Sequence, residues 1–278
     1  MKLLSRLALA AGASTLMIAS FSTSASATTG WFKWGGLKVH GAVAVDYQLY
    51  FLGDTWVDGQ GWRLQNWDNY HPGNGYAYVQ AAAGTSLAVG VDANLYLVAA
   101  DDSVWSSPSN PFSPGWVGRS PTACEGGTIQ IGQLPTHHNI AQGNAIYVVT
   151  ALGSIRSWNV GSACWQAMPA LPSGIATDVS IYSDFNPWVV NGNGTIYRWT
   201  GSAWFALTGL SPGLNDNNLA IGAGSRSLWQ WNGSSFSQTD WSNGTIMQLG
   251  SIELPTWRAP TRVLVTNDNS MWTFGGVY

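Results

Sequence analysis

Charged residues are scarce in this chain. Lys, Arg, Asp and Glu together make up 9% of its 278 residues, whereas an ordinary soluble domain contains about 25%. Amphipathic helices need charged side chains on their outer faces, so the composition argues against a mainly helical protein. The 11 basic residues are outnumbered by 14 acidic ones, and no basic cluster is present to bind a phosphate backbone. The composition therefore excludes a nucleic-acid partner.

Long apolar runs are lacking except near the N-terminus. Residues 1–27 begin with Lys2 and Arg6, continue with an apolar stretch and end with small residues up to Ala27. This order is typical of a secretory signal peptide, and the apolar stretch is shorter than the roughly 20 residues of a membrane span. We predict a cleaved signal peptide over 1–27, one domain over 28–278, no integral membrane span, and secretion to the extracellular space or periplasm.

Only two cysteines are present, Cys124 and Cys164. Export to an oxidising compartment favours their pairing, so we predict a disulfide between them. Because the closed loop would hold about 40 residues, the bond is expected to stabilise the fold by roughly 3 to 4 kcal/mol in the chain-entropy model. The sequence leaves open whether the fold brings the two residues within bonding distance.

Glycine and tryptophan, in contrast, are abundant, with 33 and 17 copies. Glycine in turns and aromatic residues in short strands indicate β structure. The clearest unit has four short segments rich in β-branched and aromatic residues, at 178–182, 187–190, 195–199 and 204–207. Turn sequences such as Asn-Gly separate them, which predicts four consecutive antiparallel strands.

The same order of segments recurs along the chain. Weaker or shorter copies cover residues 42–62, 87–117, 129–165, 219–236 and 246–272. Six copies give a period of about 42 residues, within the range typical of solenoids and propellers, and four-stranded units of this length are typical of propeller blades. We therefore expect an all-β fold, a six-bladed β-propeller of four-stranded antiparallel blades.

The two ends of the chain favour a closed ring. The last copy ends after its third predicted strand, while residues 31–37 share the Trp-Phe start and Gly-Leu finish of the fourth segment at 204–210. We predict that this N-terminal strand completes the last blade, which would remove both exposed sheet edges. The tryptophans at repeated positions, Trp105 and Trp116 among them, are accordingly assigned to packing between blades.

Residues 176–210 resemble a tectonin repeat of the tectonin β-propeller family. The likeness rests on an Asp-Val-Ser-Ile start, a Gly-Thr-Ile-Tyr-Arg-Trp centre and a Gly-Ser-Ala-Trp-Phe-Ala-Leu-Thr-Gly-Leu finish. Secreted members of that family include lectins that bind lipopolysaccharide or methylated glycans between or on the blades. The resemblance implies a secreted, lectin-like, non-catalytic protein whose partners are cell-surface glycans. Since a fold does not establish a function, a protein-binding scaffold and a glycoside hydrolase stay open as alternatives.

Carbohydrate binding needs an exposed aromatic face beside amide, hydroxyl or guanidinium groups. Loops that interrupt the repeat and one polar strand position offer that combination. The candidate carbohydrate contacts are Trp67, Asp68, Asn69, Tyr70, His71, Arg198 and Trp241. The first five are expected to share one polar loop after the first blade.

Catalytic and metal-binding motifs are not found. The sequence contains no sialidase Asp-box, no Gly-x-Ser-x-Gly elbow and no His-Glu-x-x-His segment, so we expect no enzyme activity. His137 and His138 are adjacent, and in an extended strand they would point to opposite faces. We therefore expect no metal and no cofactor.

Overall fold

The computed structural model describes residues 31–36, 38–45, 48–68, 76–108, 112, 114–131, 139–181, 185–193, 195–207, 221–223, 228–230, 246–249, 262–266 and 268–274. Its regular elements are all β-strands, β1 to β22, and they form antiparallel sheets. The all-β prediction is confirmed. The predicted signal peptide lies outside the described residues.

The first three sheets contain four strands each, in chain order. Sheet 1 has β2 (Gly41–Val45), β3 (Gln48–Val57), β4 (Gly61–Asp68) and β5 (Tyr76–Gly84). Sheet 2 has β6 (Ser86–Val89), β7 (Leu95–Val98), β8 (Val104–Ser106) and β9 (Val117–Arg119). Sheet 3 has β10 (Ile140–Gln142), β11 (Ile146–Val149), β12 (Ile155–Asn159) and β13 (Cys164–Ala167).

The remaining sheets follow the same order. Sheet 4 has β14 (Ala176–Ile181), β15 (Pro187–Asn191), β16 (Ile196–Trp199) and β17 (Trp204–Ala206). Sheet 5 has two described strands, β18 (Ile221–Ala223) and β19 (Leu228–Gln230). Sheet 6 has β20 (Ile246–Leu249), β21 (Arg262–Thr266), β22 (Met271–Phe274) and β1 (Trp31–Lys33). The four strands predicted for the clearest repeat are therefore confirmed in sheet 4.

The N-terminal strand completes the C-terminal sheet. β1 pairs antiparallel with β22, with Trp31 opposite Phe274 and Lys33 opposite Trp272. The Trp34 amide extends the pairing by donating to the Met271 carbonyl at 2.9 Å. The predicted completion of the last sheet by the N-terminal strand is therefore confirmed.

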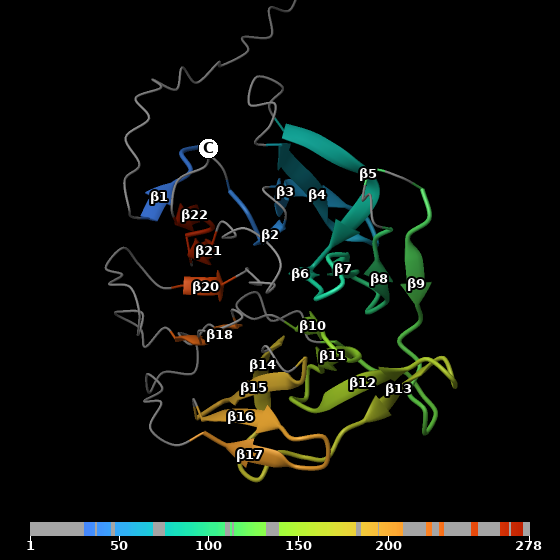
Figure 1. Cartoon of the computed structure of the whole chain (residues 1–278). Coiled ribbons are helices and arrows are strands. Elements are labelled where there is room, and N and C mark those ends of the chain that lie inside the picture. Colours follow the sequence, from blue (N-terminus) through green and yellow to red (C-terminus); the bar gives the residue numbers. More distant parts are fainter. Residues whose placement is uncertain are drawn as a thin grey trace, which may run out of the picture.

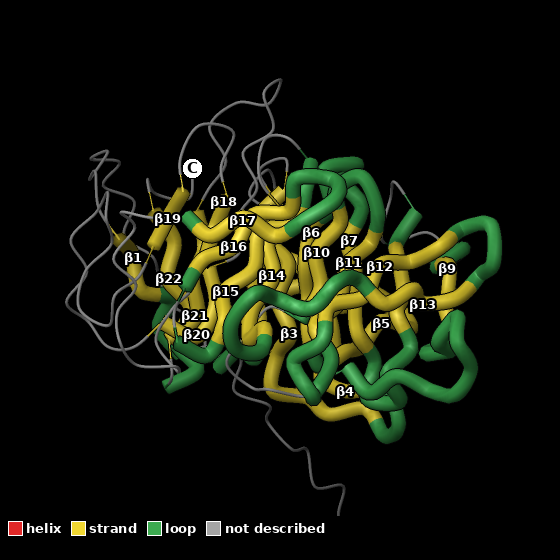
Figure 2. Tube along the Cα trace, turned by 90° about the horizontal axis from the view of Figure 1, so that it is seen from below, coloured by secondary structure: helices red, strands yellow, loops and turns green. Residues whose placement is uncertain are grey.

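The sheets are arranged around a common centre (Figure 1). The first strands of successive sheets contact one another in the order β2, β6, β10, β14, β18 and β20, and β20 contacts β2 again. A view turned by 90° shows the strands in one thick band with loops along both of its edges (Figure 2). These contacts close a circle, which is the arrangement of a β-propeller.

The apolar core lies between neighbouring sheets. One cluster joins sheets 1 and 2 through residues such as Leu64 and Leu97, and another joins sheets 3 and 4 through residues such as Val149 and Tyr197. A further cluster, with Phe51 and Met271, joins sheets 6 and 1. Because each sheet buries its faces against its two neighbours, the stability of one sheet depends on the next.

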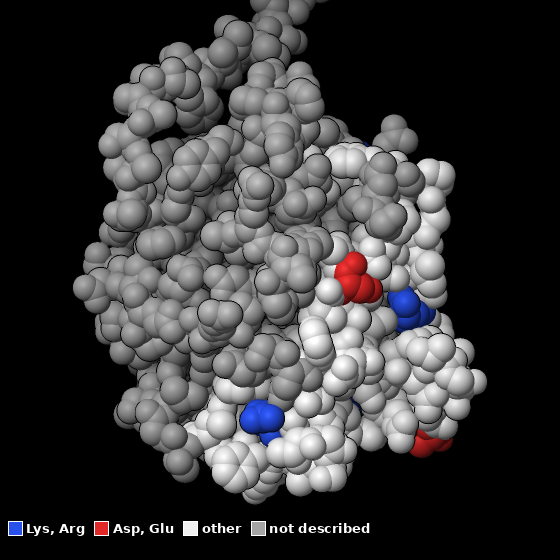
Figure 3. Space-filling view, viewed as in Figure 1, with Lys and Arg blue, Asp and Glu red and all other residues white. Residues whose placement is uncertain are grey.

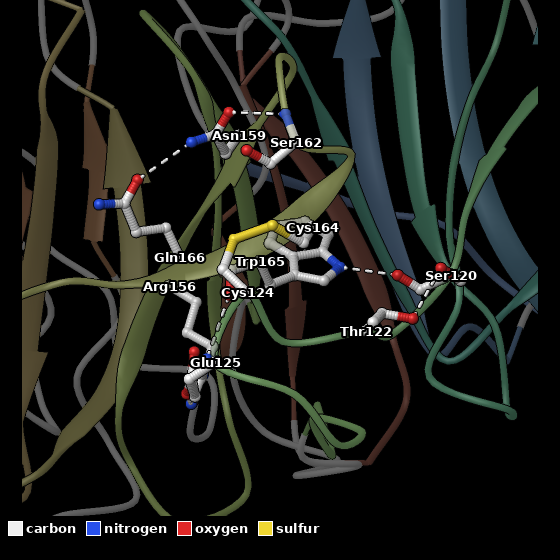
Figure 4. The surroundings of a disulfide bond; sticks show 10 residues. All are labelled: Ser120, Thr122, Cys124, Glu125, Arg156, Asn159, Ser162, Cys164, Trp165 and Gln166. Atoms are coloured by element: carbon white, nitrogen blue, oxygen red, sulfur yellow. Dashed lines mark hydrogen bonds and ion pairs between the residues drawn. A yellow bond between two sulfur atoms is a disulfide. The ribbon is translucent and has the colours of Figure 1, made fainter.

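A segment between sheets 2 and 3 covers the outer edge of β13 (Figure 4). Ala123 forms a parallel bridge with Trp165, whose amide donates to the Thr122 carbonyl at 2.8 Å. The pairing places Cys124 beside Cys164, with the Cα atoms 5.0 Å apart, and the two form a disulfide. The predicted disulfide is confirmed, and it fastens a strand-like segment onto an otherwise open sheet edge.

Trp165 is the centre of this attachment. Its ring is fully buried, and its indole Nε1 donates to the Ser120 carbonyl at 3.1 Å. Arg156 donates to the Trp165 carbonyl and to the Glu125 carboxylate. The hydrogen bond from Arg156 also lowers the pKa of Glu125 below its ordinary value.

Replacing both cysteines by serine, Cys124→Ser with Cys164→Ser, should lower the free energy of unfolding by about 3 to 4 kcal/mol, because the unfolded chain regains the freedom of a loop of about 40 residues. Urea unfolding followed by tryptophan fluorescence measures the change. Reduction of the unaltered protein by dithiothreitol should produce the same loss. A difference below about 1 kcal/mol in both experiments would contradict a stabilising role for the bond.

Candidate functional site

Two of the five residues predicted for one polar loop belong to a strand instead. Trp67 and Asp68 belong to β4, where Trp67 is opposite Leu49 and Tyr76. The reason is that the β3–β4 hairpin turns at residues 58–60, so both of its strands are long and β4 extends to Asp68. The expectation of a polar loop after the first blade is therefore wrong for these two residues. The other members of that predicted loop, and the separate candidate, lie outside the described residues: Asn69, Tyr70, His71 and Trp241.

Arg198 is the one predicted contact whose side chain is described. It is exposed on β16, opposite Trp188 on β15 and Phe205 on β17. Phe205 is itself exposed. Arg198 therefore belongs to sheet 4, whereas Trp67 belongs to sheet 1.

A cavity of about 790 Å³ lies between sheets 1 and 2. Sheet 1 supplies the β3–β4 turn, with Asp58 and Gln60, and two small side chains of β5, Ala82 and Ala83. Sheet 2 supplies Leu97, the β7–β8 turn, Trp105 of β8 and the segment that precedes β9, with Phe112 and Trp116. None of these residues is a sequence-predicted contact, and the repeat pattern assigns the two tryptophans to packing alone.

The cavity exists because one layer of the packing between the sheets is incomplete. Trp105, Arg156 and Tyr197 occupy equivalent positions, each one residue after the buried residue that starts β8, β12 or β16. Tyr197 is 3% exposed, whereas Trp105 is 39% exposed. The wall of sheet 1 that shares the cavity with Trp105 carries the alanines of β5, which are too short to fill the space.

Hydrogen bonds and a glycine fix the orientation of Trp105. Its indole Nε1 donates to Ser103 Oγ at 2.8 Å, and the Ser103 hydroxyl donates in turn to the Asp101 carboxylate. Gly118 is opposite Trp105 on β9, and a β carbon placed there would be 2.8 Å from Cη2 of the indole. The ring therefore lies against the backbone of β9, and it also borders the cavity.

Two turns meet at the rim of the cavity. The Ala100 amide donates to the Gln60 carbonyl at 2.9 Å, which joins the β7–β8 turn to the β3–β4 turn. Asp58 and Asp101 are exposed on these joined turns, and among the described residues they are the only ionisable ones in the cavity lining. Figure 3, which shows the face seen in Figure 1, has few and scattered charged atoms on the part of the surface that the structure describes. The cavity thus combines an acidic rim with aromatic walls.

Asp102, beside the cavity, links sheet 2 to the segment that leads into sheet 3. It has a left-handed backbone with φ of 64°, and its Oδ1 accepts a hydrogen bond from the Ile131 amide at 2.9 Å. Burial raises the pKa of Asp102 above its ordinary value, the hydrogen bond from Ile131 opposes this rise, and the nearby Asp101 charge adds to it. The turn that carries Asp101 is therefore held by Gln60 on one side and by Ile131 on the other.

Metal-binding clusters and membrane-crossing helices are both absent from the described residues. No group of three or more His, Cys, Asp and Glu side chains in this part of the chain is placed to bind a metal ion. No helix within the same residues has the length and hydropathy that a membrane crossing needs.

No family model matches the chain, and no curated protein matches it. Solved structures do match. A gluconolactonase from Xanthomonas campestris has a TM-score of 0.58 at 13% identity, covering 86% of this chain and 86% of its own. A putative gluconolactonase has a TM-score of 0.58 at 13% identity, covering 90% of this chain and 93% of its own. An inactive variant of virginiamycin B lyase from Staphylococcus aureus, bound to quinupristin, has a TM-score of 0.53 at 11% identity, covering 89% of this chain and 98% of its own.

These likenesses support the β-propeller and correct one expectation. The lack of catalytic motifs predicted no enzyme activity, but structures with this fold include a gluconolactonase and a lyase. The expectation is overturned, because the absence of those motifs does not separate this chain from enzymes that share its fold. At these identities the likeness shows the fold alone, and it does not confirm membership of the tectonin family.

The replacement Asp102→Asn should raise the melting temperature at pH 7. The amide keeps an acceptor for the Ile131 amide and tolerates the left-handed backbone, while the desolvated charge is removed. Because the folded-state pKa of Asp102 is raised, the charge lowers stability above that pKa and has no effect once the residue is protonated in both states. The gain should therefore shrink as the pH falls and vanish below about 3.9.

Thermal unfolding from pH 3 to pH 8 by circular dichroism measures this difference. The control Asp102→Ala removes the acceptor from a buried amide and should destabilise the protein by about 1 to 3 kcal/mol at every pH. A stability difference for Asp102→Asn that grows as the pH falls would contradict the direction of the pKa shift.

Proposed function

We propose that this chain is a six-bladed β-propeller that binds a carbohydrate in the cavity between sheets 1 and 2. The observation that carries the proposal is the Trp105 ring, which is half-exposed, held in one orientation and flanked by polar groups. A sugar ring has an apolar face of C–H groups and a rim of hydroxyls, so it needs a flat aromatic surface beside hydrogen-bonding groups.

The cavity offers a partner for each part of a sugar. The apolar face of the ring stacks on Trp105, while its hydroxyls donate to the carboxylates of Asp58 and Asp101. The Gln60 side chain can donate to a hydroxyl or ring oxygen. A cavity of about 790 Å³ falls within the range of small-molecule sites in proteins. Because the site lies between two sheets of a rigid ring, its groups are positioned before the ligand arrives.

Further observations support the remaining parts of the proposal. Six sheets with a closed circle of first strands fit six blades, the fifth being represented by two described strands. A site between blades agrees with what the tectonin resemblance implies for lectins of that family. The disulfide is consistent with an oxidising compartment, and hence with a secreted domain over 28–278 that recognises cell-surface glycans.

Hydrolysis of a glycosidic bond is a second candidate function. Its supporting observation is the pair of carboxylates, Asp58 and Asp101, on two hydrogen-bonded turns at one cavity. Glycoside hydrolases use two such groups, one as general acid and the other as base or nucleophile. Within the described residues, Asp101 also accepts hydrogen bonds from the Ser103 amide and hydroxyl, which hold its carboxylate in place for a role as base or nucleophile.

The replacement Trp105→Ala should weaken carbohydrate binding by at least tenfold, because it removes the stacking surface. A glycan array identifies the ligand, and calorimetric titration measures the affinity. Phe205→Ala is the control, since Phe205 is an exposed aromatic residue on a different sheet, and it should leave binding unchanged. Gly118→Ala should also weaken binding, because the new methyl group displaces the Trp105 ring. Unchanged affinity in Trp105→Ala and Gly118→Ala would contradict the site.

Chromogenic glycosides of the sugar that the glycan array identifies test the second candidate function, hydrolysis of a glycosidic bond. If the chain is a hydrolase, Asp58→Asn and Asp101→Asn should each lower turnover by at least a hundredfold while leaving the fold intact by circular dichroism. Asp54→Asn is the matched control, since Asp54 is an exposed carboxylate of the same sheet that does not border the cavity. Sugar binding with no turnover would restrict the function to binding.

A further inference from the structure

We infer that the cavity between sheets 1 and 2 selects a ligand that carries an ammonium group, and specifically an amino sugar with a free amine. This inference rests on the proposed carbohydrate site and names the class of sugar. The observation is the charge of the lining: its two ionisable residues among those described, Asp58 and Asp101, are both carboxylates, and its larger side chains are aromatic.

The two carboxylates are available to a ligand. They lie on the two turns joined by the hydrogen bond from the Ala100 amide to the Gln60 carbonyl. In the described part of the chain, neither Asp58 nor Asp101 forms an ion pair. A cation held between the two turns is attracted by both carboxylates.

The aromatic walls favour the same kind of ligand. Trp105, Phe112 and Trp116 border the cavity, and the indole face is the strongest of the aromatic surfaces that attract an ammonium ion. An amino sugar matches the whole lining, since its C–H face suits the indole and its ammonium suits the carboxylates.

The same lining disfavours anionic sugars. A phosphate or a carboxylate on the ligand would lie beside Asp58 and Asp101, and no Lys, Arg or His of the described chain borders the cavity. The walls of the cavity are apolar, which strengthens the field of the two carboxylates over that of an open surface. Among the surface glycans expected from the sequence, those with free amines are therefore favoured over phosphorylated ones.

Four methyl β-glycosides of one ring shape test the inference: those of glucosamine, glucose, N-acetylglucosamine and glucuronic acid. Calorimetric titration at low salt should show glucosamine binding at least tenfold more tightly than glucose or N-acetylglucosamine, with glucuronic acid the weakest. The preference should decrease at high ionic strength, because the carboxylates at the rim are exposed and salt screens them.

Variants assign the preference to the two carboxylates. The double replacement Asp58→Asn with Asp101→Asn should reduce the preference for glucosamine over glucose to within about twofold, while the amide introduced at position 101 still accepts from Ser103. Asp54→Asn is the matched control, because Asp54 is an exposed carboxylate of the same sheet that does not border the cavity, and it should keep the preference.

The possible failures are distinguishable. Equal affinity for all four glycosides, with loss of binding in Trp105→Ala, would overturn the amine preference and leave the carbohydrate site standing. Isobutylamine, which has the charge but no sugar ring, provides the opposite comparison. If it binds as tightly as the glucosamine glycoside, the carbohydrate proposal is overturned and the cation preference stands. Absence of binding by all five compounds would overturn both.

Discussion

The structure depends on the pairing of β1 with β22. Each sheet has two apolar faces and cannot bury both without a neighbour on each side, so an open row of such sheets would end in two exposed faces. Pairing of residues 31–33 with 272–274 joins the two ends of the chain in one sheet, and that sheet packs against sheet 1 through Phe51 and Met271. The pairing also protects β22, which would otherwise be an open edge.

In a closed ring, the size of the side chains between two neighbouring sheets decides whether the space between them is filled. The sheets are held at their inner strands, so a short residue further out leaves space that the backbone cannot remove by moving closer. At the position equivalent to Trp105, sheets 3 and 4 show two ways of filling this layer. Tyr197 is buried in the apolar cluster between sheets 3 and 4, and Arg156 donates to Glu125 in the segment held by the disulfide. Between sheets 1 and 2 the space remains as a cavity.

The strand pattern and the closure could be predicted from the sequence because both depend on local signals. Turn residues and short segments rich in β-branched and aromatic residues mark each hairpin. The Trp-Phe start of residues 31–37 marks the N-terminal strand that completes the last sheet. The cavity could not be predicted in this way. It lies between residues of β5 and β8, which belong to different sheets and come together only when the two sheets pack. The expectation of a polar loop after the first blade is wrong for Trp67 and Asp68, because the bulged β3–β4 pair extends to Gln48 and Asp68 and takes both residues into a strand. The pairing of the two cysteines could be predicted, but its geometry could not, since the bridge between Ala123 and Trp165 brings the cysteines together.

Gluconolactonase and virginiamycin B lyase share this architecture, so the ring itself does not decide between binding and catalysis. Within the proposed site, Asp101 has two positions of influence. Through Ser103 it orients the indole of Trp105, and at the rim it presents charge to whatever occupies the cavity. In the proposed site, Asp101 both supports the Trp105 ring and contacts the ligand. Movement of its carboxylate towards a ligand would therefore alter the support of the ring. Asp58 lies on the other turn, outside the hydrogen-bonded chain from Asp101 through Ser103 to Trp105, so in the proposed site its carboxylate would adjust to a ligand without moving the indole.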